Sequence, residues 1–369
     1  MRVLVLSASY GSGHNAAAQS LAGAFATAGA SVTVVDHFRD LVHPAFDRAS
    51  RALYAWTLRR APALWGLAYG LGDCMTSDSP WALGVPRLGA RRLAKLLDAL
   101  EPDAVVTVHA TPALALSALA RTGRRTPPHT TVVTDFVAHS QWIASRVDRY
   151  CVAAEEVKGE FVARGIAPDR VVVTGVPLRA GFEAPLDRLA ARRPLGLSPD
   201  LPVVLAMAGA HGAFGRLPDV ARMLKGLATP VQGLVVTGHD DGLADKIRRL
   251  TAGSMVRTFA FVDDVRPLMA AADLLISKAG GMTLAEAMAA ELPLLTYGSL
   301  PGQERRNERF ASRAGVALVA RGYGELGRTL ERALGEPKLL DRLRERMRRV
   351  RRPDASRHIV SLVLGRALD

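Results

Sequence analysis

Short apolar runs recur along the whole chain of 369 residues, and glycine-rich or polar turns and longer amphipathic stretches separate them. Apolar runs of about four to eight residues bounded by such turns are typical of buried parallel strands, and amphipathic stretches between them predict helices. This alternation predicts an α/β fold built from βαβ units. The strands are expected at 3–7, 31–35, 103–109, 130–134, 149–153 and 170–174 in the first half, and at 202–208, 231–237, 255–261, 272–276, 293–297 and 316–319 in the second.

A segment without clear periodicity, residues 179–200, separates the two sets of strands. It is polar, basic and contains prolines, which is typical of a linker between domains. We therefore predict two Rossmann-like doubly wound domains, at residues 1–180 and 200–345.

Composition narrows the choice of partners. The net charge of +13 favours anionic partners, which include phosphates, nucleic acid and an anionic membrane surface. Seven arginines between 342 and 352 predict first a solvated basic helix, and then contact with anionic lipid or nucleic acid. The two cysteines provide neither metal-site spacing nor a disulfide framework, which agrees with a reducing cytoplasm. No signal peptide or membrane-spanning run is expected, so membrane association is predicted to be peripheral.

The most informative turn follows the expected strand 272–276. Gly280 and Gly281 open a helix there, and glycines let the backbone approach a ligand while the first free N–H groups of the helix face it. The positive end of the helix dipole favours a phosphate. Glu286 comes one helical turn after Thr283 and is suited to accept hydrogen bonds from sugar hydroxyls. The pattern predicts a nucleotide pocket without a metal; the alternative is an ordinary βα turn with a surface glutamate.

A second glycine-rich turn follows the first expected strand and places His14 at the mouth of the next helix. Histidine is the side chain that most readily acts as a base near neutral pH, and the helix dipole keeps it neutral. A capping histidine without chemistry is the alternative. Asp135 directly follows the strand 130–134, at the end of the sheet where open α/β folds bind ligands. It is a second candidate for the base or its orienting partner, or it caps the next turn.

Two further stretches carry polar residues suited to a sugar nucleotide. A third glycine-rich turn contains Gly209, Ala210 and His211 after the strand 202–208. A loop with Gln303 and Glu304 follows the strand 293–297, and it has the donors and acceptors that a sugar ring needs. Helix N-terminal chemistry is the alternative for this loop.

Residues 46–95 combine aromatic and basic side chains with long aliphatic stretches. Aromatic rings at headgroup depth and cations on anionic lipid are what a peripheral membrane contact requires. The residues expected in this contact are Trp56, Trp65, Trp81, Arg59 and Arg60. A helical subdomain with inward-facing aromatics is an equally common explanation, and nucleic-acid binding fits the aliphatic stretches less well.

Six motifs occur in one order over nearly the whole chain, and together they resemble the diacylglycerol glycosyltransferases: the bacterial processive diacylglycerol glucosyltransferases and the plant monogalactosyldiacylglycerol synthases, within the MurG-like GT-B glycosyltransferases of family 28. The motifs are S-x-S-Y-G-S-G-H (7–14), V-V-T-D-F-x-x-H-x-x-W (132–142), T-G-V-P-L (174–178), M-A-G-A-H-G (207–212), S-K-A-G-G-M-T-L-A-E-A (277–287) and P-G-Q-E-x-x-N (301–307). The plant members have three successive glycines before the histidine, whereas this chain has Gly11-Ser12-Gly13, which is closer to the bacterial form.

The resemblance implies a GT-B fold with a cleft between the two domains and a last helix, at about 350–369, that packs back onto the first domain. It implies that the second domain holds a UDP-hexose, with Glu286 on the ribose. It places the other donor contacts at Gly280, Gly281, Met282 and Thr283 for the diphosphate, Gln303 and Glu304 for the sugar, and Gly209, Ala210 and His211 along the cleft.

The resemblance also implies the reaction. The first domain would bring diacylglycerol from the cytoplasmic face of the membrane to the turn with Gly11, Gly13 and His14. The lipid hydroxyl would then attack the anomeric carbon with inversion, and no metal would be needed. His14 is the first choice for the base or its partner, and Asp135 is the second.

Four other functions remain open at this point. A UDP-GlcNAc 2-epimerase shares the GT-B fold but has no need of the segment 46–95. A non-catalytic sensor of UDP-sugar or anionic lipid would not need His14, Glu286 and Gln303 together. A nucleic-acid binder is supported by charge alone, and a MurG-like transferase would use another lipid acceptor. Sedimentation with anionic liposomes separates the epimerase from the transferases.

Overall fold

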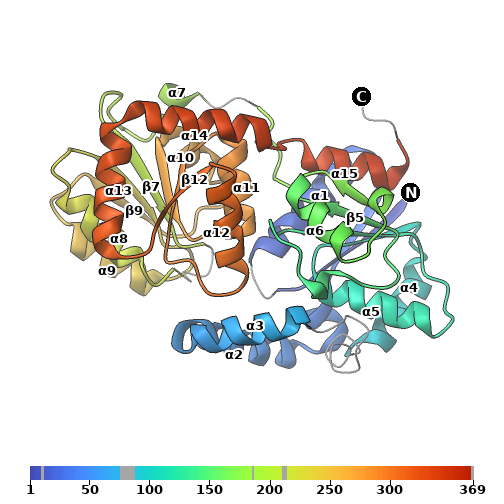
Figure 1. Cartoon of the computed structure of the whole chain (residues 1–369). Helices are drawn as coiled ribbons and strands as arrows, with labels where there is room; N and C mark the ends of the chain where they lie inside the picture. The colour runs from blue at the N-terminus through green and yellow to red at the C-terminus, as the bar shows by residue number, and fades with distance from the viewer. Residues whose placement is uncertain (10–11, 75–87, 185–186, 210–213, 367–369) are drawn as a thin grey trace. The chain divides into compact units, whose positions relative to one another are not determined.

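The computed structural model describes residues 1–9, 12–74, 88–184, 187–209 and 214–366, apart from the side chains of Ser12 and Arg59. The chain divides into two compact units. Unit 1 consists of Met1–Ala180, Pro301–Gln303 and Arg352–Asp369, and unit 2 consists of Gly181–Leu300 and Glu304–Arg351. Each unit contains one six-stranded parallel sheet with helices packed around it, which confirms the predicted fold class (Figure 1).

The sheet of unit 1 has the strand order β2-β1-β3-β4-β5-β6. Its strands are β1 (Arg2–Ser7), β2 (Ser31–Asp36), β3 (Ala104–Thr107), β4 (His129–Val132), β5 (Arg149–Val152) and β6 (Val171–Val173). Its helices are α1 (Ser12–Thr27), α2 (Pro44–Arg60), α3 (Pro62–Cys74), α4 (Ala90–Leu100), α5 (Ala110–Arg121), α6 (Glu155–Ala163) and α15 (Ala355–Leu364), with a π-helix η1 (His37–Val42) and 3₁₀ turns η2 (Ser140–Trp142) and η3 (Pro168–Arg170). The central strand β1 is buried from its second residue on, which explains why its sequence is an uninterrupted apolar run.

The sheet of unit 2 has the order β12-β11-β10-β7-β8-β9. Its strands are β7 (Val203–Met207), β8 (Gln232–Val236), β9 (Val256–Phe259), β10 (Leu274–Ser277), β11 (Leu294–Tyr297) and β12 (Ala317–Ala320). Its helices are α7 (Arg188–Arg192), α8 (Leu217–Gly226), α9 (Asp241–Thr251), α10 (Arg266–Ala271), α11 (Gly281–Ala289), α12 (Gln303–Arg313), α13 (Tyr323–Gly335) and α14 (Pro337–Val350), and the first residue of α12 groups with unit 1. All twelve expected strands are present, and each observed strand begins and ends within about two residues of its predicted bounds.

Apolar side chains on the strands form a core in each unit. In unit 1, Leu4 and Leu6 of β1 and Val105 of β3 pack against Leu93 and Leu97 of α4. The last helix of the chain, α15, packs on α1, and Arg149 of β5 donates a hydrogen bond of 2.9 Å to the carbonyl of Leu362. Figure 1 shows α15 beside α1. The helix α15 therefore belongs to the same unit as the first strand.

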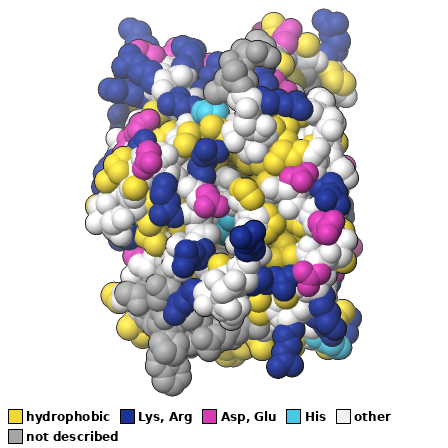
Figure 2. Space-filling view, turned by 90° about the vertical axis from the view of Figure 1, so that its right-hand side faces the viewer, with side chains coloured by type: hydrophobic (Ala, Val, Ile, Leu, Met, Phe, Trp, Pro, Cys, Tyr) yellow, Lys and Arg dark blue, Asp and Glu magenta, His cyan; other side chains and the backbone are white. Residues whose placement is uncertain are grey.

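Basic side chains are distributed rather than gathered on the face shown in Figure 2, where small groups of Lys and Arg alternate with apolar and acidic side chains. The arginine-rich stretch forms α14, whose Leu339, Leu343 and Met347 are buried. Arg348 and Arg351 both pair with Glu291, at 2.7 and 3.0 Å. Part of the arginine-rich stretch therefore forms ion pairs within unit 2.

The segment predicted to be an irregular linker contains the short helix α7, and this difference has a physical reason. The side chain of Arg192 is only 5% exposed and reaches the residues just before β10, at the amino end of that strand. It donates hydrogen bonds to the carbonyls of Ala271 at 2.9 Å and Pro199 at 2.8 Å, and it pairs with Asp273 at 2.6 Å. A buried arginine with these partners fixes the segment in place.

Replacing Arg192 with methionine should lower the free energy of unfolding by about 3 kcal/mol, because it leaves several buried acceptors without their donor. Chemical denaturation monitored by circular dichroism measures this loss. The neighbouring Arg193 is exposed, and Arg193→Met should change the unfolding free energy by less than about 0.5 kcal/mol. Equal losses in the two variants would show that the contacts of Arg192 do not stabilise the fold.

Candidate functional site

The strand orders place the predicted site residues at the points where open α/β sheets bind ligands. In unit 1 the chain runs from β1 outward to β2 and then returns to β3, on the other side of β1. In unit 2 it runs from β7 through β8 to β9 and returns to β10, beside β7. Ligands bind at the carboxyl ends of the two strands that flank such a reversal. These ends carry His14 and Val108 in unit 1, and Gly209 and Gly280 in unit 2.

His14 is the third residue of α1, and its ring is fixed by two contacts. The Nδ1 atom lies 2.8 Å from the carbonyl oxygen of Val108 and 3.1 Å from the hydroxyl oxygen of Thr134. The ring meets that of His109 edge-on, with 4.6 Å between the ring centroids, and lies 6.2 Å from the ring centroid of Trp142. Residues after β1, β3 and β4 therefore converge on one imidazole.

These contacts assign the tautomer of the neutral ring. A carbonyl oxygen only accepts hydrogen bonds, so Nδ1 of His14 carries the proton and donates it to Val108. Nε2 is then the atom with the lone pair. Burial lowers the pKa of His14 below 6.5, although the Asp135 carboxylate and the bond to Val108 raise it in part. The imidazole is neutral at neutral pH, which is the state that a base requires.

Asp135 is buried at the end of β4 and acts on His14 electrostatically. The loop that follows it is held at several points. The N–H of Ala138 donates to the Glu160 carboxylate at 2.8 Å, and the N–H of Ser140 donates to the Asp73 carboxylate at 2.8 Å. The structure therefore brings together His14 and Asp135, the two residues predicted to carry the proton transfer.

One histidine of this cluster, His109, was not singled out from the sequence. His109 was included in the strand 103–109, but β3 ends at Thr107 and His109 instead caps α5, where its Nδ1 accepts from the N–H of Thr111 at 3.0 Å. Burial holds the pKa of His109 well below 6.5, so it is neutral. Its position just past a strand end, like that of Asp135, is the signal that could have identified it.

The predicted phosphate cradle lies at the start of α11. Gly280 is the N-cap. Because glycine has no side chain, it cannot cap the first N–H groups of the helix. The nearest atom to a side chain added at Gly280 would be the hydroxyl oxygen of Thr283, at 3.9 Å. The turn is braced by Ser277, whose hydroxyl donates to the carbonyl of Met207 at 3.0 Å, and by Asn307, whose amide donates to Ala279 at 3.2 Å. A helix mouth whose first N–H groups have no side-chain cap suits an anion.

The other predicted donor residues of unit 2 lie near this mouth. Met282, Thr283 and Glu286 are half-buried residues of the first two turns of α11. Glu304 accepts a hydrogen bond of 2.9 Å from the N–H of Leu300 and pairs with Lys278. The segment with Gln303 and Glu304 was predicted to be a loop, but it is the first turn of α12, because Asn307, Phe310 and Ala311 recur at helical spacing and are buried. Gln303 itself groups with unit 1.

Some predicted residues fall where the structure gives no description. Gly11, Ala210, His211 and Trp81 lie outside the described residues, as does the side chain of Arg59. Gly209 and Gly13 are described: Gly209 is exposed with φ +73°, a conformation that favours glycine, and Gly13 is the second residue of α1.

The first part of the expected aromatic and basic segment, residues 46–74, belongs to a helical hairpin, α2–α3, with both packed and exposed aromatic side chains. Figure 1 shows the two helices side by side. Trp65 is half-buried and packs edge-on against Tyr54, with 4.9 Å between the ring centroids, so it does not lie on the exposed face. Trp56 and Arg60 are exposed. The hairpin therefore packs part of its aromatics inward and presents the rest.

An apolar exposed surface covers the hairpin. Five of the eleven exposed large apolar side chains among the described residues lie on these two helices, each between 56% and 64% exposed. They are Leu53, Trp56, Leu64, Leu67 and Leu71. Leu64, Leu67 and Leu71 recur at helical spacing on one stripe of α3. Such a concentration of exposed apolar side chains marks an interaction surface; we call these five residues the apolar hairpin face.

The hairpin is attached to the loop that carries Asp135. Near the end of α3, the carbonyl of Tyr69 lies 2.9 Å from Nε2 of His139, and Asp73 accepts hydrogen bonds from both the N–H and the hydroxyl of Ser140. The loop in turn carries Trp142, which lies against His14. The apolar hairpin face and the histidine cluster are thus parts of one hydrogen-bonded assembly within unit 1.

None of the described helices is both long and apolar enough to cross a membrane.

Comparison with known proteins decides between the functions that this geometry permits. Residues 14–178 match the monogalactosyldiacylglycerol (MGDG) synthase family, and residues 207–356 match the glycosyltransferase family 28 C-terminal domain. The chain is 30% identical over 365 residues to the processive diacylglycerol beta-glucosyltransferase of Bacillus cytotoxicus, covering 98% of this chain and 93% of that protein. The chain belongs to the diacylglycerol glycosyltransferase family. A second member, from Bacillus mycoides, is also 30% identical, over 366 residues.

Solved structures agree with the GT-B fold of this diacylglycerol glycosyltransferase family member. MurG of Acinetobacter baumannii has a TM-score of 0.66 at 18% identity, with 99% of each chain covered. The UDP-GlcNAc 2-epimerase of Neisseria meningitidis has a TM-score of 0.61 at 14% identity, with 99% of this chain and all of that chain covered. At these identities the likeness shows the fold alone. Family membership, and not the fold, separates the transferase from the epimerase.

Proposed function

We propose that this enzyme transfers a hexose from a UDP-hexose to the hydroxyl of diacylglycerol, or of a glycosyl-diacylglycerol, at the membrane surface, with inversion at the anomeric carbon. The observation that carries this proposal is the contact of His14 Nδ1 with the carbonyl oxygen of Val108. The 2.8 Å contact between Nδ1 and the Val108 carbonyl leaves Nε2 as a lone-pair base. The curated relatives named above are diacylglycerol glucosyltransferases, which supports the acceptor.

The acceptor half of the reaction belongs to unit 1. Nε2 of His14 takes the proton of the acceptor hydroxyl as its oxygen forms a bond to the anomeric carbon. The resulting imidazolium is stabilised by the Asp135 carboxylate, which already raises the pKa of His14. Asp135 thereby acts through His14 as its positioning and charge partner.

The donor half belongs to unit 2. The bond between the anomeric carbon and the diphosphate oxygen breaks, and UDP leaves with the electron pair. Backbone N–H groups of Gly281, Met282 and Thr283 at the mouth of α11 stabilise the negative charge that develops on the diphosphate. Glu286, on the second turn of the same helix, binds the ribose hydroxyls. This arrangement supplies charge stabilisation without a metal, and we propose that none is required.

The apolar hairpin face brings the enzyme to its lipid substrate. Its five large apolar side chains are suited to the acyl boundary, and the exposed Arg60 is suited to anionic headgroups. Both cysteines are free thiols, Cys74 exposed and Cys151 buried, which supports a reducing compartment. We therefore place the enzyme peripherally at the cytoplasmic face of the membrane.

A product assay tests the proposal. The purified protein is mixed with diacylglycerol in anionic vesicles in the presence of EDTA. UDP-glucose, UDP-galactose and UDP-GlcNAc are supplied in separate reactions. The lipids are then extracted and their masses are measured by mass spectrometry. One added hexose on the lipid is the expected result, and the mass and donor identify the sugar. Conversion of UDP-GlcNAc without any lipid product would instead support an epimerase. Activity that EDTA abolishes and Mg²⁺ restores would overturn the metal-free mechanism.

Glu286→Ala should raise KM for the UDP-hexose about tenfold or more, because charge-assisted hydrogen bonds to the ribose are lost. Steady-state kinetics at varied donor concentration measures the change, and vesicle binding should be unaffected. Glu331 is an exposed glutamate of α13, and Glu331→Ala serves as the matched control with unchanged KM. Unchanged kinetics in Glu286→Ala would remove Glu286 from the ribose contact.

The pH profile separates the roles of Asp135 and His14. A neutral His14 is the active form, so kcat/KM should fall as the pH drops through its pKa, which lies below 6.5. Asp135 raises that pKa, so Asp135→Asn should move this acid limb to still lower pH. The measurement is kcat/KM from pH 4.5 to 8 in both proteins. An acid limb that does not move would show that Asp135 does not act on the base.

A further inference from the structure

A cavity of about 850 Å³ lies within unit 2, at the end of the sheet opposite to the predicted phosphate cradle. It is lined by Pro202, Asp273 and Leu292, which come just before β7, β10 and β11, whereas the phosphate cradle follows the other ends of β7 and β10. Its volume is in the range of small-molecule sites in proteins. The reaction proposed above makes no use of it.

Five arginines and five carboxylates line this cavity, and the arginines are gathered around two of the carboxylates. Five arginines line it: Arg188 and Arg192 from α7, Arg344 and Arg348 from α14, and Arg351 after α14. Asp273 pairs with both Arg188 and Arg192, and Glu291 pairs with both Arg348 and Arg351. Each of these two groups carries one positive charge in excess, while Arg344 pairs with Asp341. The other lining carboxylates, Glu183 and Asp200, belong to exposed residues of the linker.

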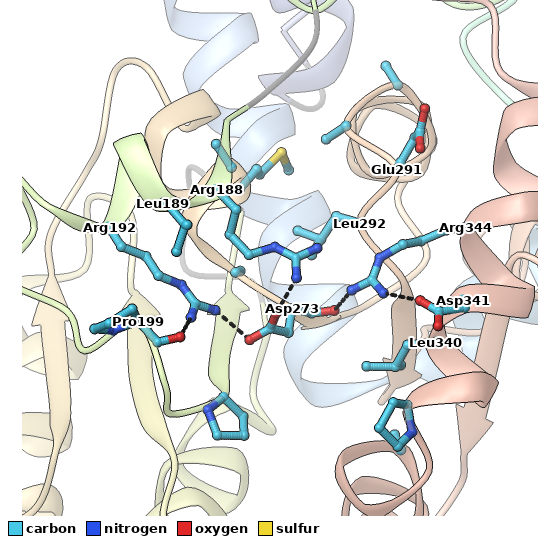
Figure 3. A pocket seen from close by; sticks show the side chains of 18 of the residues that line it. Arg188, Leu189, Arg192, Pro199, Asp273, Glu291, Leu292, Leu340, Asp341 and Arg344 are labelled. Atoms are coloured by element: carbon cyan, nitrogen blue, oxygen red, sulfur yellow. Dashed lines mark hydrogen bonds and ion pairs between the residues drawn. The ribbon is translucent and has the colours of Figure 1, made fainter.

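Arg188 and Arg344 are the two arginines suited to a ligand. Arg192 is saturated by backbone carbonyls and Asp273, as described above. Among the described residues, Arg188 pairs with Asp273 at 2.9 Å, and its side chain is 43% exposed. Arg344 donates to Asp341 at 2.8 Å and to the backbone carbonyl of Asp273 at 3.4 Å. Figure 3 shows the two guanidinium groups turned toward each other on either side of Asp273.

Two like charges in this position repel each other, and the pKa of Arg344 reflects that repulsion in part. Burial, together with the nearby Arg188, lowers the pKa of Arg344. A guanidinium has five N–H donors, and the described residues engage one donor of Arg188 and two of Arg344. An anion between them would accept from both and relieve the repulsion.

We propose that this cavity binds a phosphate group, free or as the monoester of a small organic molecule, between Arg188 and Arg344. Phosphate is the anion whose oxygens match two converging guanidinium forks. The cavity is larger than the group itself, and its apolar lining by Leu189, Leu292 and Leu340 has room for an organic substituent. The site is distinct from the phosphate cradle of α11, because it lies at the other ends of the strands.

Titration with inorganic phosphate and, in a second arm, with glycerol 3-phosphate tests the site. Isothermal calorimetry is carried out at matched ionic strength in the presence of saturating UDP, which occupies the donor pocket. Binding to the wild-type protein should be saturable. Arg344→Gln and Arg188→Gln should each weaken it about tenfold or more. Arg349 is the matched control, because it lies on α14, pairs with Glu345 and does not line the cavity, so Arg349→Gln should bind like the wild type.

The outcomes are distinct. Tighter binding of glycerol 3-phosphate than of phosphate would assign the monoester, and equal binding would assign the free ion. Arg188→Gln leaves Asp273 paired with Arg192, so this variant remains informative if Arg344→Gln folds poorly. Absence of saturable binding in the wild type, or equal affinity in both cavity variants and the control, would overturn the proposal. The product assay is independent of either result.

Discussion

Replacing His14 with asparagine should lower kcat about 100-fold or more while leaving KM for the UDP-hexose nearly unchanged. Nδ1 of His14 donates to the Val108 carbonyl over 2.8 Å, and the asparagine amide can donate in the same region without supplying a base. Removing a positioned base costs about 10²–10⁴-fold in rate. The measurement is kcat with diacylglycerol in mixed micelles, where delivery of the lipid does not limit the rate.

Two further variants test whether the loss of kcat is specific to His14. His358 is a half-buried histidine of α15 in the same unit, and His358→Asn should keep kcat within about twofold of the wild type. Asp135→Asn should lower kcat less than His14→Asn, because Asp135 acts through the imidazole. Near-normal kcat in His14→Asn together with a large loss in Asp135→Asn would transfer the role of base to Asp135.

The parts of this structure that follow from the sequence are those set by apolar periodicity. Each strand is a short apolar run because parallel strands are covered on both faces, and a turn residue marks each end. The carboxyl ends of parallel strands share one edge of a sheet, so His14 and Asp135 were expected on the same edge although 121 positions separate them. Their electrostatic contact is consistent with that expectation.

What the sequence did not reveal depends on contacts between distant segments. Strand order decides which loops flank the reversal in each sheet, and no local pattern encodes it. His109 was hidden inside an apolar run because a strand and the N-cap that follows it look continuous in sequence. The helix α7 is stabilised by contacts of Arg192 with Ala271 and Asp273, which lie far away in the sequence. Its five residues therefore carry no periodic signal of their own.

The hairpin shows the same limit at the level of single side chains. Trp56 and Trp65 lie nine positions apart in the same segment, yet Trp65 packs against Tyr54 while Trp56 is exposed. The pairing of α2 with α3 decides which tryptophan turns inward. Composition predicted that the segment 46–95 contacts a membrane surface or packs its aromatics inward, and the structure shows Trp65 packed inward and Trp56 exposed.

Exchanging two leucines of the apolar hairpin face for glutamate, Leu64→Glu with Leu67→Glu, should weaken binding to anionic vesicles about 100-fold or more. Each buried leucine contributes about 1.5–3 kcal/mol, and the added carboxylates are repelled by anionic lipid. Co-sedimentation measures binding, while kcat on a detergent-dispersed acceptor should stay within about twofold. Met255 is an exposed apolar residue of unit 2, and Met255→Glu should bind vesicles like the wild type. Equal sedimentation of all three proteins would show that the hairpin does not contact the membrane, even if the enzyme makes glycolipid, because the lipid would then reach His14 by another route.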